Sequence, residues 1–220
     1  MINKDYILRL VEKFGRYLAI ILQLRQYNRY EEALIYIDDL LLKTTGFTSR
    51  FINSLSEEML LKTFSPLGTL NVEACLWTAL LLKAEGEIYE DQQNTDESYY
   101  RYLKALHLML AALLHEPVAA DTDFYATASE LLTRLADYEL PVATQSLLFA
   151  YYEHSGQYAK AEDTLFEMLE TGGADQNTIE RGAAFYRRLL ARSESDLAAG
   201  NFSREEAEEG LAQMKRKEQR

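Results

Sequence analysis

The stretch YLAIILQLRQYNRYEEALIYIDDLLLKT, residues 17–44, carries two apolar stripes of helical period on either side of a short polar break. Before the break, apolar residues recur every three or four positions, which predicts one helix over residues 4–26. After the break the same period continues over residues 30–44. Only residues 28–29 separate the two stripes, so the sequence predicts a tight antiparallel helical hairpin over residues 4–45.

The first hairpin has a counterpart further along the chain. Both copies have a turn residue, an aromatic residue two positions later, a small residue three positions after that, and two apolar residues at helical spacing. The two sets are Asn28, Tyr30, Ala33, Ile37 and Leu40, and Gly156, Tyr158, Ala161, Leu165 and Met168. The sequence therefore predicts a second hairpin over residues 141–171, the most repeat-like of the later ones.

This pattern resembles the helix-turn-helix of the tetratricopeptide repeat, which implies stacked antiparallel hairpins in a right-handed solenoid with a concave surface. Ile21 and Phe149 stand where the family has a small residue, and Thr45 and Gly173 replace its closing proline, so the repeats are degenerate. The whole chain, with its YEEAL turn and closing NFSREEAEEGL segment, also resembles an uncharacterised family of bacterial tetratricopeptide-like proteins. The resemblance implies an all-α fold in a single domain over residues 1–220.

The resemblance also places candidate partner-binding residues on the inward face of the first helix of each pair. These candidates are Leu18, Leu22 and Arg25 in the first pair and Ser146, Ala150 and Glu153 in the second. No pairing of lysine with asparagine occupies these positions. The carboxylate clamp with which some members of the family bind peptide C-termini is therefore not expected, and an apolar or uncharged polar ligand is favoured.

A second candidate contact surface lies in an aromatic cluster. Tyr99, Tyr100 and Tyr102 are nearly consecutive, and helical side chains about 100° apart cannot all face one core, so at least one is expected to be exposed. With Trp77 and Tyr89 close in sequence, we add Trp77, Tyr99 and Tyr100 to the candidates. In the simpler interpretation, the tyrosines fill seams between helices and their hydroxyls reach water.

The rest of the chain is expected to be helical, with loops at Gly, Pro and polar clusters. The sequence predicts a short apolar turn at 47–55 and a short helix capped by Ser56. The longer helices are predicted at 71–90, 99–114, 123–137, 141–155, 158–170 and 177–199. Thr95 or Asp96 is expected to cap the helix 99–114, which ends at 115–117; residues 121–123 open the helix 123–137, and residues 172–173 end the helix 158–170. Ser203 with Glu206 predicts a capping box for a last helix.

Composition limits the possible partners. The 220 residues carry a formal net charge of -12, and 48% of them are hydrophobic. A net negative field repels polyphosphates and anionic membranes, so we expect no nucleic-acid or membrane partner. No apolar run reaches about 18 residues, and the N-terminal segment does not have the pattern of a signal peptide, so we expect a cytoplasmic protein.

Catalytic chemistry finds little support in the sequence. His107 and His115 are eight residues apart, too far along a helix to share a metal, and His154 is interpreted as a surface or capping residue. Cys75 lies in an apolar stretch, which favours a buried, inert thiol. Phosphate-loop, dinucleotide-binding and nucleophile-elbow motifs are absent from the sequence. We therefore expect no enzyme activity, no cofactor and no metal.

These observations favour a non-catalytic module that binds a protein or peptide partner. The alternative is a helical sensor of a small molecule or peptide, which would have a closed pocket with a few convergent polar groups. Residues 17–24 are apolar nearly all round the helix, so this end is expected to dock on other helices or on a second copy. A homo-oligomer through the N-terminal helix is thus a further expectation.

Overall fold

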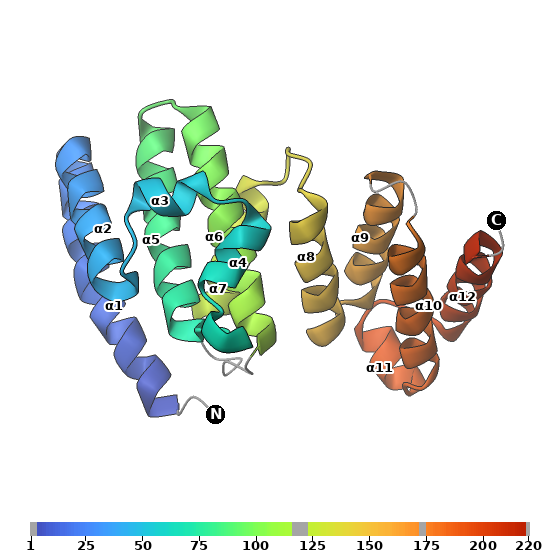
Figure 1. Ribbon diagram of the computed structural model, residues 1–220. Coiled ribbons are helices and arrows are strands. Elements are labelled where there is room, and N and C mark those ends of the chain that lie inside the picture. Colours follow the sequence, from blue (N-terminus) through green and yellow to red (C-terminus); the bar gives the residue numbers. More distant parts are fainter. Residues whose placement is uncertain (1–3, 116–122, 172–174, 219–220) are drawn as a thin grey trace. The chain divides into compact units, whose positions relative to one another are not determined.

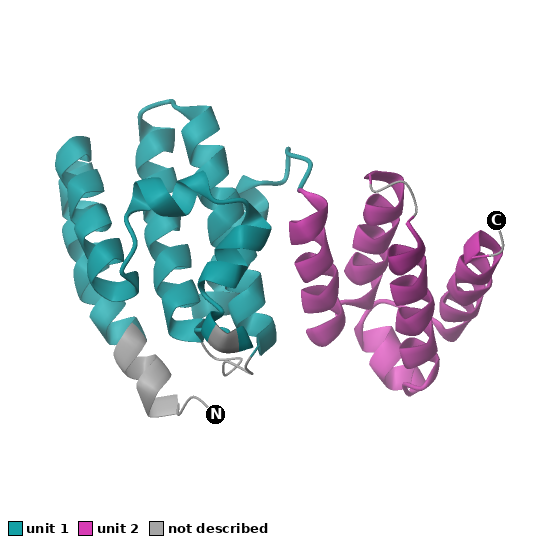
Figure 2. Cartoon of the chain, viewed as in Figure 1, with its two compact units in different colours: residues 1–140 teal, residues 141–220 magenta. Residues whose placement is uncertain are grey.

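The computed structural model describes residues 4–115, 123–171 and 175–218, and within these ranges the protein contains twelve α-helices, one 3-10 helix and no strand (Figure 1). The chain divides into two compact units, Met1–Leu140 and Pro141–Arg220 (Figure 2). The all-α prediction is confirmed for the described residues. None of the described helices is long and apolar enough to cross a membrane.

Unit 1 is built around one long helical hairpin. Its helices are α1 (Lys4–Gln26), α2 (Tyr30–Thr45), α3 (Ser49–Ser54), α4 (Glu57–Thr63), the 3-10 helix η1 (Pro66–Gly68), α5 (Val72–Asp91), α6 (Thr95–His115) and α7 (Asp123–Arg134). Antiparallel α5 and α6 pack along their whole length, and α1 and α2 cover α5 while α7 covers α6. Most side chains of α5 and α6 are buried because neighbours surround them on several sides.

Unit 2 has its own apolar core. Its helices are α8 (Val142–His154), α9 (Tyr158–Thr171), α10 (Gln176–Leu190), α11 (Glu194–Ala199) and α12 (Arg204–Glu218). The core gathers Phe149, Leu165, Phe185 and Met214 from four of these helices. The hairpin α8/α9 and the pair α10 and α12 supply most of the contacts within the unit.

Four turns between helices share one backbone geometry. Asn28, Gln93, Gly156 and Asn201 have positive φ angles of 55°, 60°, 73° and 56°. In each turn the N–H of this residue bonds to the carbonyl three residues back, and the next N–H bonds to the carbonyl five back. These are the two hydrogen bonds of the Schellman motif, which satisfies the last carbonyls of a helix. The pairs α1/α2, α5/α6, α8/α9 and α11/α12 are thus joined in the same way.

Several predicted helix boundaries are confirmed. The predicted helix 4–26 is α1, and Ser56 caps α4 by accepting the Met59 N–H. The capping box of α12 is formed: Ser203 Oγ accepts the Glu206 N–H at 3.1 Å, and Glu206 Oε2 accepts the Ser203 N–H at 2.7 Å.

Three local predictions are wrong. The predicted apolar turn 47–55 contains α3, which Thr48 caps by accepting the Phe51 N–H. The predicted helix 177–199 is broken after Leu190, because the side chain of Ser193 accepts the Asp196 N–H and starts α11. The cap of α6 is Asn94 rather than Thr95 or Asp96, since Asn94 Oδ1 accepts the Glu97 N–H.

Parts of the predicted boundaries lie outside the described residues. These are the end expected at 116–117, the start expected at 121–122 and the break expected at 172–173.

Candidate functional site

A cleft of about 710 Å³ opens in unit 1 between α2, α3, α5 and α6. Its lining combines carboxylates, guanidiniums, tyrosines and aliphatic side chains. The lining residues are Leu34, Ile35, Asp38, Asp39, Ser49, Arg50, Asn53, Ser54, Glu85, Tyr89, Glu97, Tyr100 and Arg101. A volume of this size with a few convergent polar groups is typical of ligand sites.

Glu85 of α5 is the one fully buried residue in the lining, with 2% of its surface exposed. Its Oε2 accepts the hydroxyl of Ser49 at 2.8 Å and Nε of Arg101 at 3.3 Å. Burial raises the pKa of Glu85, and these two hydrogen-bond donors oppose the increase. The carboxylate is therefore held in an environment that favours its neutral form.

The short helix α3 forms one wall of the cleft and is held at both ends by charged side chains. At its first turn, Asp38 Oδ1 accepts the Ser49 N–H at 2.6 Å. At its end, buried Lys104 of α6 donates to the carbonyls of Asn53 at 2.7 Å and Leu55 at 2.6 Å. Negative charge at the start and positive charge at the end of a helix match its dipole. Six residues make few internal hydrogen bonds, so these contacts fix the position of α3.

Arg101 of α6 links the opposite wall to the buried carboxylate. Its guanidinium pairs with Glu85 and Glu97 and lies 4.9 Å from the centre of the Tyr89 ring. The cleft therefore already holds one guanidinium between carboxylates and an aromatic face, an arrangement in which arginine is well satisfied.

Exposed apolar side chains lie at the rim of the cleft. Ile35 of α2 is 63% exposed and Tyr100 of α6 is 53% exposed, and both line the cleft. Tyr99 is half-buried and contacts the rings of Tyr100 and Tyr138. The expectation that one residue of the tyrosine cluster would be exposed is confirmed by Tyr100.

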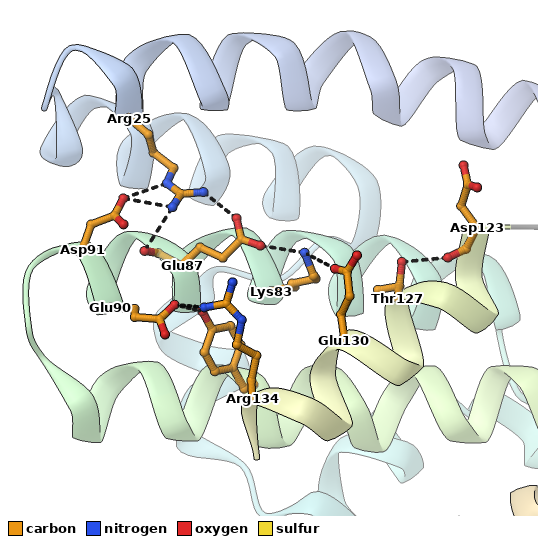
Figure 3. Close-up of polar contacts among 10 residues, drawn as sticks. Arg25, Lys83, Glu87, Glu90, Asp91, Asp123, Thr127, Glu130 and Arg134 are labelled. Carbon is orange, nitrogen blue, oxygen red and sulfur yellow. Dashed lines mark hydrogen bonds and ion pairs between the residues drawn. The ribbon is translucent and has the colours of Figure 1, made fainter. Parts of the chain in front are cut away.

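The predicted inward face of α1 is partly occupied by contacts within unit 1. Arg25 lies between Glu87 and Asp91 of α5 (Figure 3), and its guanidinium nitrogens are 2.5 Å from Glu87 Oε2 and 2.9 Å from Asp91 Oδ2. Lys83 continues this network, bonding Glu87 at 2.6 Å and Glu130 of α7 at 3.0 Å. Arg25 is thus a seam residue that ties α1 to α5.

The predicted inward face of α8 is occupied in the same manner. The hydroxyl of Ser146 accepts a hydrogen bond from Nη1 of Arg181 at 3.0 Å. Glu153 holds Arg188 through two hydrogen bonds of 2.6 and 2.8 Å. Both arginines come from α10, so Ser146 and Glu153 join α8 to α10 within unit 2. Ala150, which lies between Ser146 and Glu153 in the sequence of α8, is half-buried.

The other candidates have different surroundings. Trp77 is 1% exposed and packs against the rings of Phe14 and Tyr17, so it belongs to the core. Leu18 is half-buried, while Leu22 remains exposed on α1. The structure therefore brings only Tyr100, with Tyr99 beside it, to the cleft.

Of the residues considered for catalysis, Cys75 and His107 are buried, and His115 and His154 are exposed. Burial raises the pKa of the Cys75 thiol to about 12 and lowers the pKa of His107 to about 4. Among the described residues, no group of three or more His, Cys, Asp or Glu side chains is arranged to hold a metal ion.

Sequence reasoning missed the polar part of the cleft. Asp38 and Glu85 looked like ordinary helical carboxylates, because α3, which brings them together at Ser49, was not predicted. One signal was present: Gly86 is followed by Tyr89, the G-x-x-Y spacing of a tetratricopeptide first helix. That register would have placed Glu85 at an apolar, buried position.

Antiparallel helix pairs with Schellman turns, together with a polar cleft in one unit, define an all-α protein of helical hairpins. The chain belongs to a family of unknown function, DUF6483, whose profile matches residues 1–219. Neither the comparison with curated proteins nor that with solved structures gave a significant match.

Proposed function

We propose that the protein is a tetratricopeptide-like, non-catalytic interaction module, and that a protein partner binds in the cleft of unit 1. The observation that carries the proposal is the cleft itself, with the exposed apolar residues Ile35 and Tyr100 at its rim. Exposed apolar side chains beside a hollow with polar groups are typical of interaction sites.

The α5/α6 pair supports the tetratricopeptide-like part of the proposal. Gly86 and Tyr89 fit the G-x-x-Y of the first helix, and Ser98 and Tyr102 occupy the A-x-x-x-F positions of the second. The spacing between these positions is the same in all three helix pairs. Ser98 comes 12 positions after Gly86, as Ala33 comes 12 positions after Ile21 and Ala161 comes 12 positions after Phe149. A Cβ on Gly86 would lie 2.5 Å from Cε1 of Tyr102, so the small residue has the packing role that it has in the repeat.

Glu85 is the departure from this repeat that matters for function. The residue before the glycine is a leucine in the repeat pattern, and here it is a buried carboxylate of the cleft. A buried ionisable group costs stability unless it is well paired, and departures from local rules concentrate at functional sites. Glu85 therefore supports placing the function in this cleft.

Site-specific photo-crosslinking in the native host tests the proposal. The full-length chain would carry benzoylphenylalanine at position 35 or 100, with position 27 as the control because Tyr27 is exposed and lies outside the cleft lining. We expect a discrete protein adduct from both cleft positions and not from position 27. The absence of such an adduct, or the same adduct from all three positions, would contradict the proposal.

A small-molecule sensor is the second candidate function. The size of the cleft, about 710 Å³, and the convergence of Asp38 and Glu85 favour it. In the crosslinking experiment a sensor would give no protein adduct at positions 35 and 100. Mass spectrometry of the chain purified under native conditions would then show a bound small molecule.

A further inference from the structure

We infer that the cleft of unit 1 receives a basic side chain, an arginine or a lysine, which the partner presents between apolar residues. The inference rests on the proposed function and adds the chemistry of the partner. Three features of the cleft carry it: the balance of charges, the position of the carboxylates, and the apolar rim.

Carboxylates outnumber cations in the lining. The charged groups are the four carboxylates of Asp38, Asp39, Glu85 and Glu97 and the two guanidiniums of Arg50 and Arg101. Asp38, Asp39 and Glu97 alone outnumber the two guanidiniums, so the lining is acidic even when Glu85 is in its neutral form. Arg101 is shared between the side chains of Glu85 and Glu97. A cationic ligand complements this hollow, and the -12 charge of the chain attracts a basic partner from a distance.

Two of the carboxylates converge on one residue. Asp38 accepts the N–H of Ser49 and Glu85 accepts its hydroxyl. Their mutual repulsion contributes to the raised pKa of Glu85. The neighbouring Asp39 is exposed, and it forms no ion pair with any residue that the structure describes. A cation that enters beside Asp39 can pair with the Asp39 carboxylate, and its positive charge reduces the repulsion between Asp38 and Glu85.

The rim fits the uncharged part of a basic side chain. Arginine and lysine carry long methylene stems that pack on apolar surface while the charged end binds elsewhere. Ile35 and Tyr100 offer such a surface, and the ring of Tyr100 is available for a cation–π contact. Arg101 on the ring of Tyr89 is an example of this contact inside the same cleft. The apolar residues that flank the basic side chain in the partner would then cover the exposed side chains of Ile35 and Tyr100.

Short peptides test the charge requirement directly. The probes are N-acetyl-Leu-Arg-Leu-amide, the same peptide with lysine, the same peptide with citrulline, which keeps the shape without the charge, and the same peptide with glutamate. Binding to the full-length chain is followed by NMR chemical shifts. We expect the two basic peptides to shift amide signals of α2, α3 and the start of α6, and to bind about tenfold more tightly than the citrulline peptide. Equal binding of the citrulline or glutamate peptide would overturn the inference.

Matched variants locate the contact. Asp39→Asn removes the free carboxylate of the cleft, and Glu31→Gln removes one negative charge on the same helix outside it. We expect Asp39→Asn to weaken the arginine peptide about fivefold to tenfold and Glu31→Gln to change its affinity less than twofold. Ile35→Ala is compared in the same way with Leu42→Ala, an exposed aliphatic residue of α2 outside the lining. Equal effects within each pair would contradict the assignment.

The outcomes separate this inference from the proposed function. If crosslinking captures a protein at positions 35 and 100 but the basic peptides do not bind, the cleft is an interaction site, and the inference that it receives a basic side chain is wrong. If the basic peptides bind but no protein is captured, the charge preference is correct and the interaction module is contradicted.

Discussion

At the scale of single residues, the fold depends on small side chains at positions where helices approach closely. A Cβ on Gly86 would meet Cε1 of Tyr102 at 2.5 Å. The Tyr102 ring is buried, and its hydroxyl donates to Glu90 at 2.9 Å, so the ring is not free to move aside. The same addition at Gly15 meets no atom within 4 Å.

These two glycines give a matched prediction. Gly86→Ala should lower the free energy of unfolding by about 1–3 kcal/mol, because overpacking forces the ring or the backbone to shift. Gly15→Ala, also within a helix, should raise it by about 0.5–1 kcal/mol, because alanine has the higher helix propensity. Urea denaturation of both variants measures the difference. Two changes of the same sign would show that the close packing at Gly86 is not as described.

Glu85 gives a prediction of pH dependence. Its folded-state pKa is raised above the ordinary value of 4.5, chiefly by desolvation. A raised pKa favours the protonated form in the folded state, so its stabilising contribution is present below the unfolded pKa and is lost as the pH rises through the folded pKa. Glu85→Gln keeps an acceptor for Ser49 and never ionises. Its melting temperature relative to the wild type should therefore increase as the pH rises from about 4 toward neutrality.

Thermal unfolding between pH 4 and pH 8 measures this slope, whatever the absolute stability of the variant. Glu31→Gln, at an exposed position of α2, is the control and should give a nearly flat difference. A flat or falling difference for Glu85→Gln would mean that the buried carboxylate is fully compensated by Ser49 and Arg101.

At the scale of elements, α3 shows how side chains can fix a helix too short to be stable alone. Buried Lys104 donates to the carbonyls of Asn53 and Leu55 at the end of α3, and burial lowers the pKa of this amine. In Lys104→Met the carbonyls of Asn53 and Leu55 lose their donor, which should cost about 1–3 kcal/mol. Hydrogen exchange should rise across α3 and remain unchanged in α9. Lys62→Met, at an exposed position of α4, is the control, and equal exchange in both variants would contradict the role of Lys104.

Long helices were predictable from sequence, whereas short ones and their contacts were not. The apolar period of residues 4–26 extends over six turns and determines α1 without ambiguity. In contrast, α3 has six residues and depends on Asp38, Glu85 and Lys104, which are distant in sequence. The break at Ser193 depends on a single capping bond that competes with helix continuation.

The candidate site was predictable only in its aromatic part. The sequence predicted that at least one tyrosine of the cluster is exposed, because neighbouring helical side chains diverge by about 100°, and Tyr100 is the exposed one. The residues predicted for the inward faces lie on α1 and α8, where Arg25 and Glu153 meet partners on α5 and α10. Such pairings depend on tertiary packing, which a single helical period does not contain.

At the scale of the whole molecule, the chain divides into two compact units. Among the described residues, unit 2 contains an apolar core cluster drawn from residues 149–214, and the cleft of unit 1 is lined by residues from the range 34–101. The sequence favoured one domain over residues 1–220, and the division at Leu140 and Pro141 makes this expectation testable.

We predict that residues 141–220, produced alone, fold into a helical unit with cooperative thermal unfolding, because they contain an apolar core cluster of their own. Gly210→Ala is the test variant within the fragment: its Cβ would lie 2.2 Å from Cε1 of Tyr186, whose hydroxyl donates to Glu162 at 2.7 Å. Gly210→Ala should lower the melting temperature of the fragment. In the full chain it should lower the midpoint of the unit 2 transition only, and Gly86→Ala should lower the midpoint of the unit 1 transition only. Circular dichroism and calorimetry measure both transitions. A fragment without cooperative unfolding, or one transition in the full chain that both substitutions shift equally, would show that the two units form a single domain.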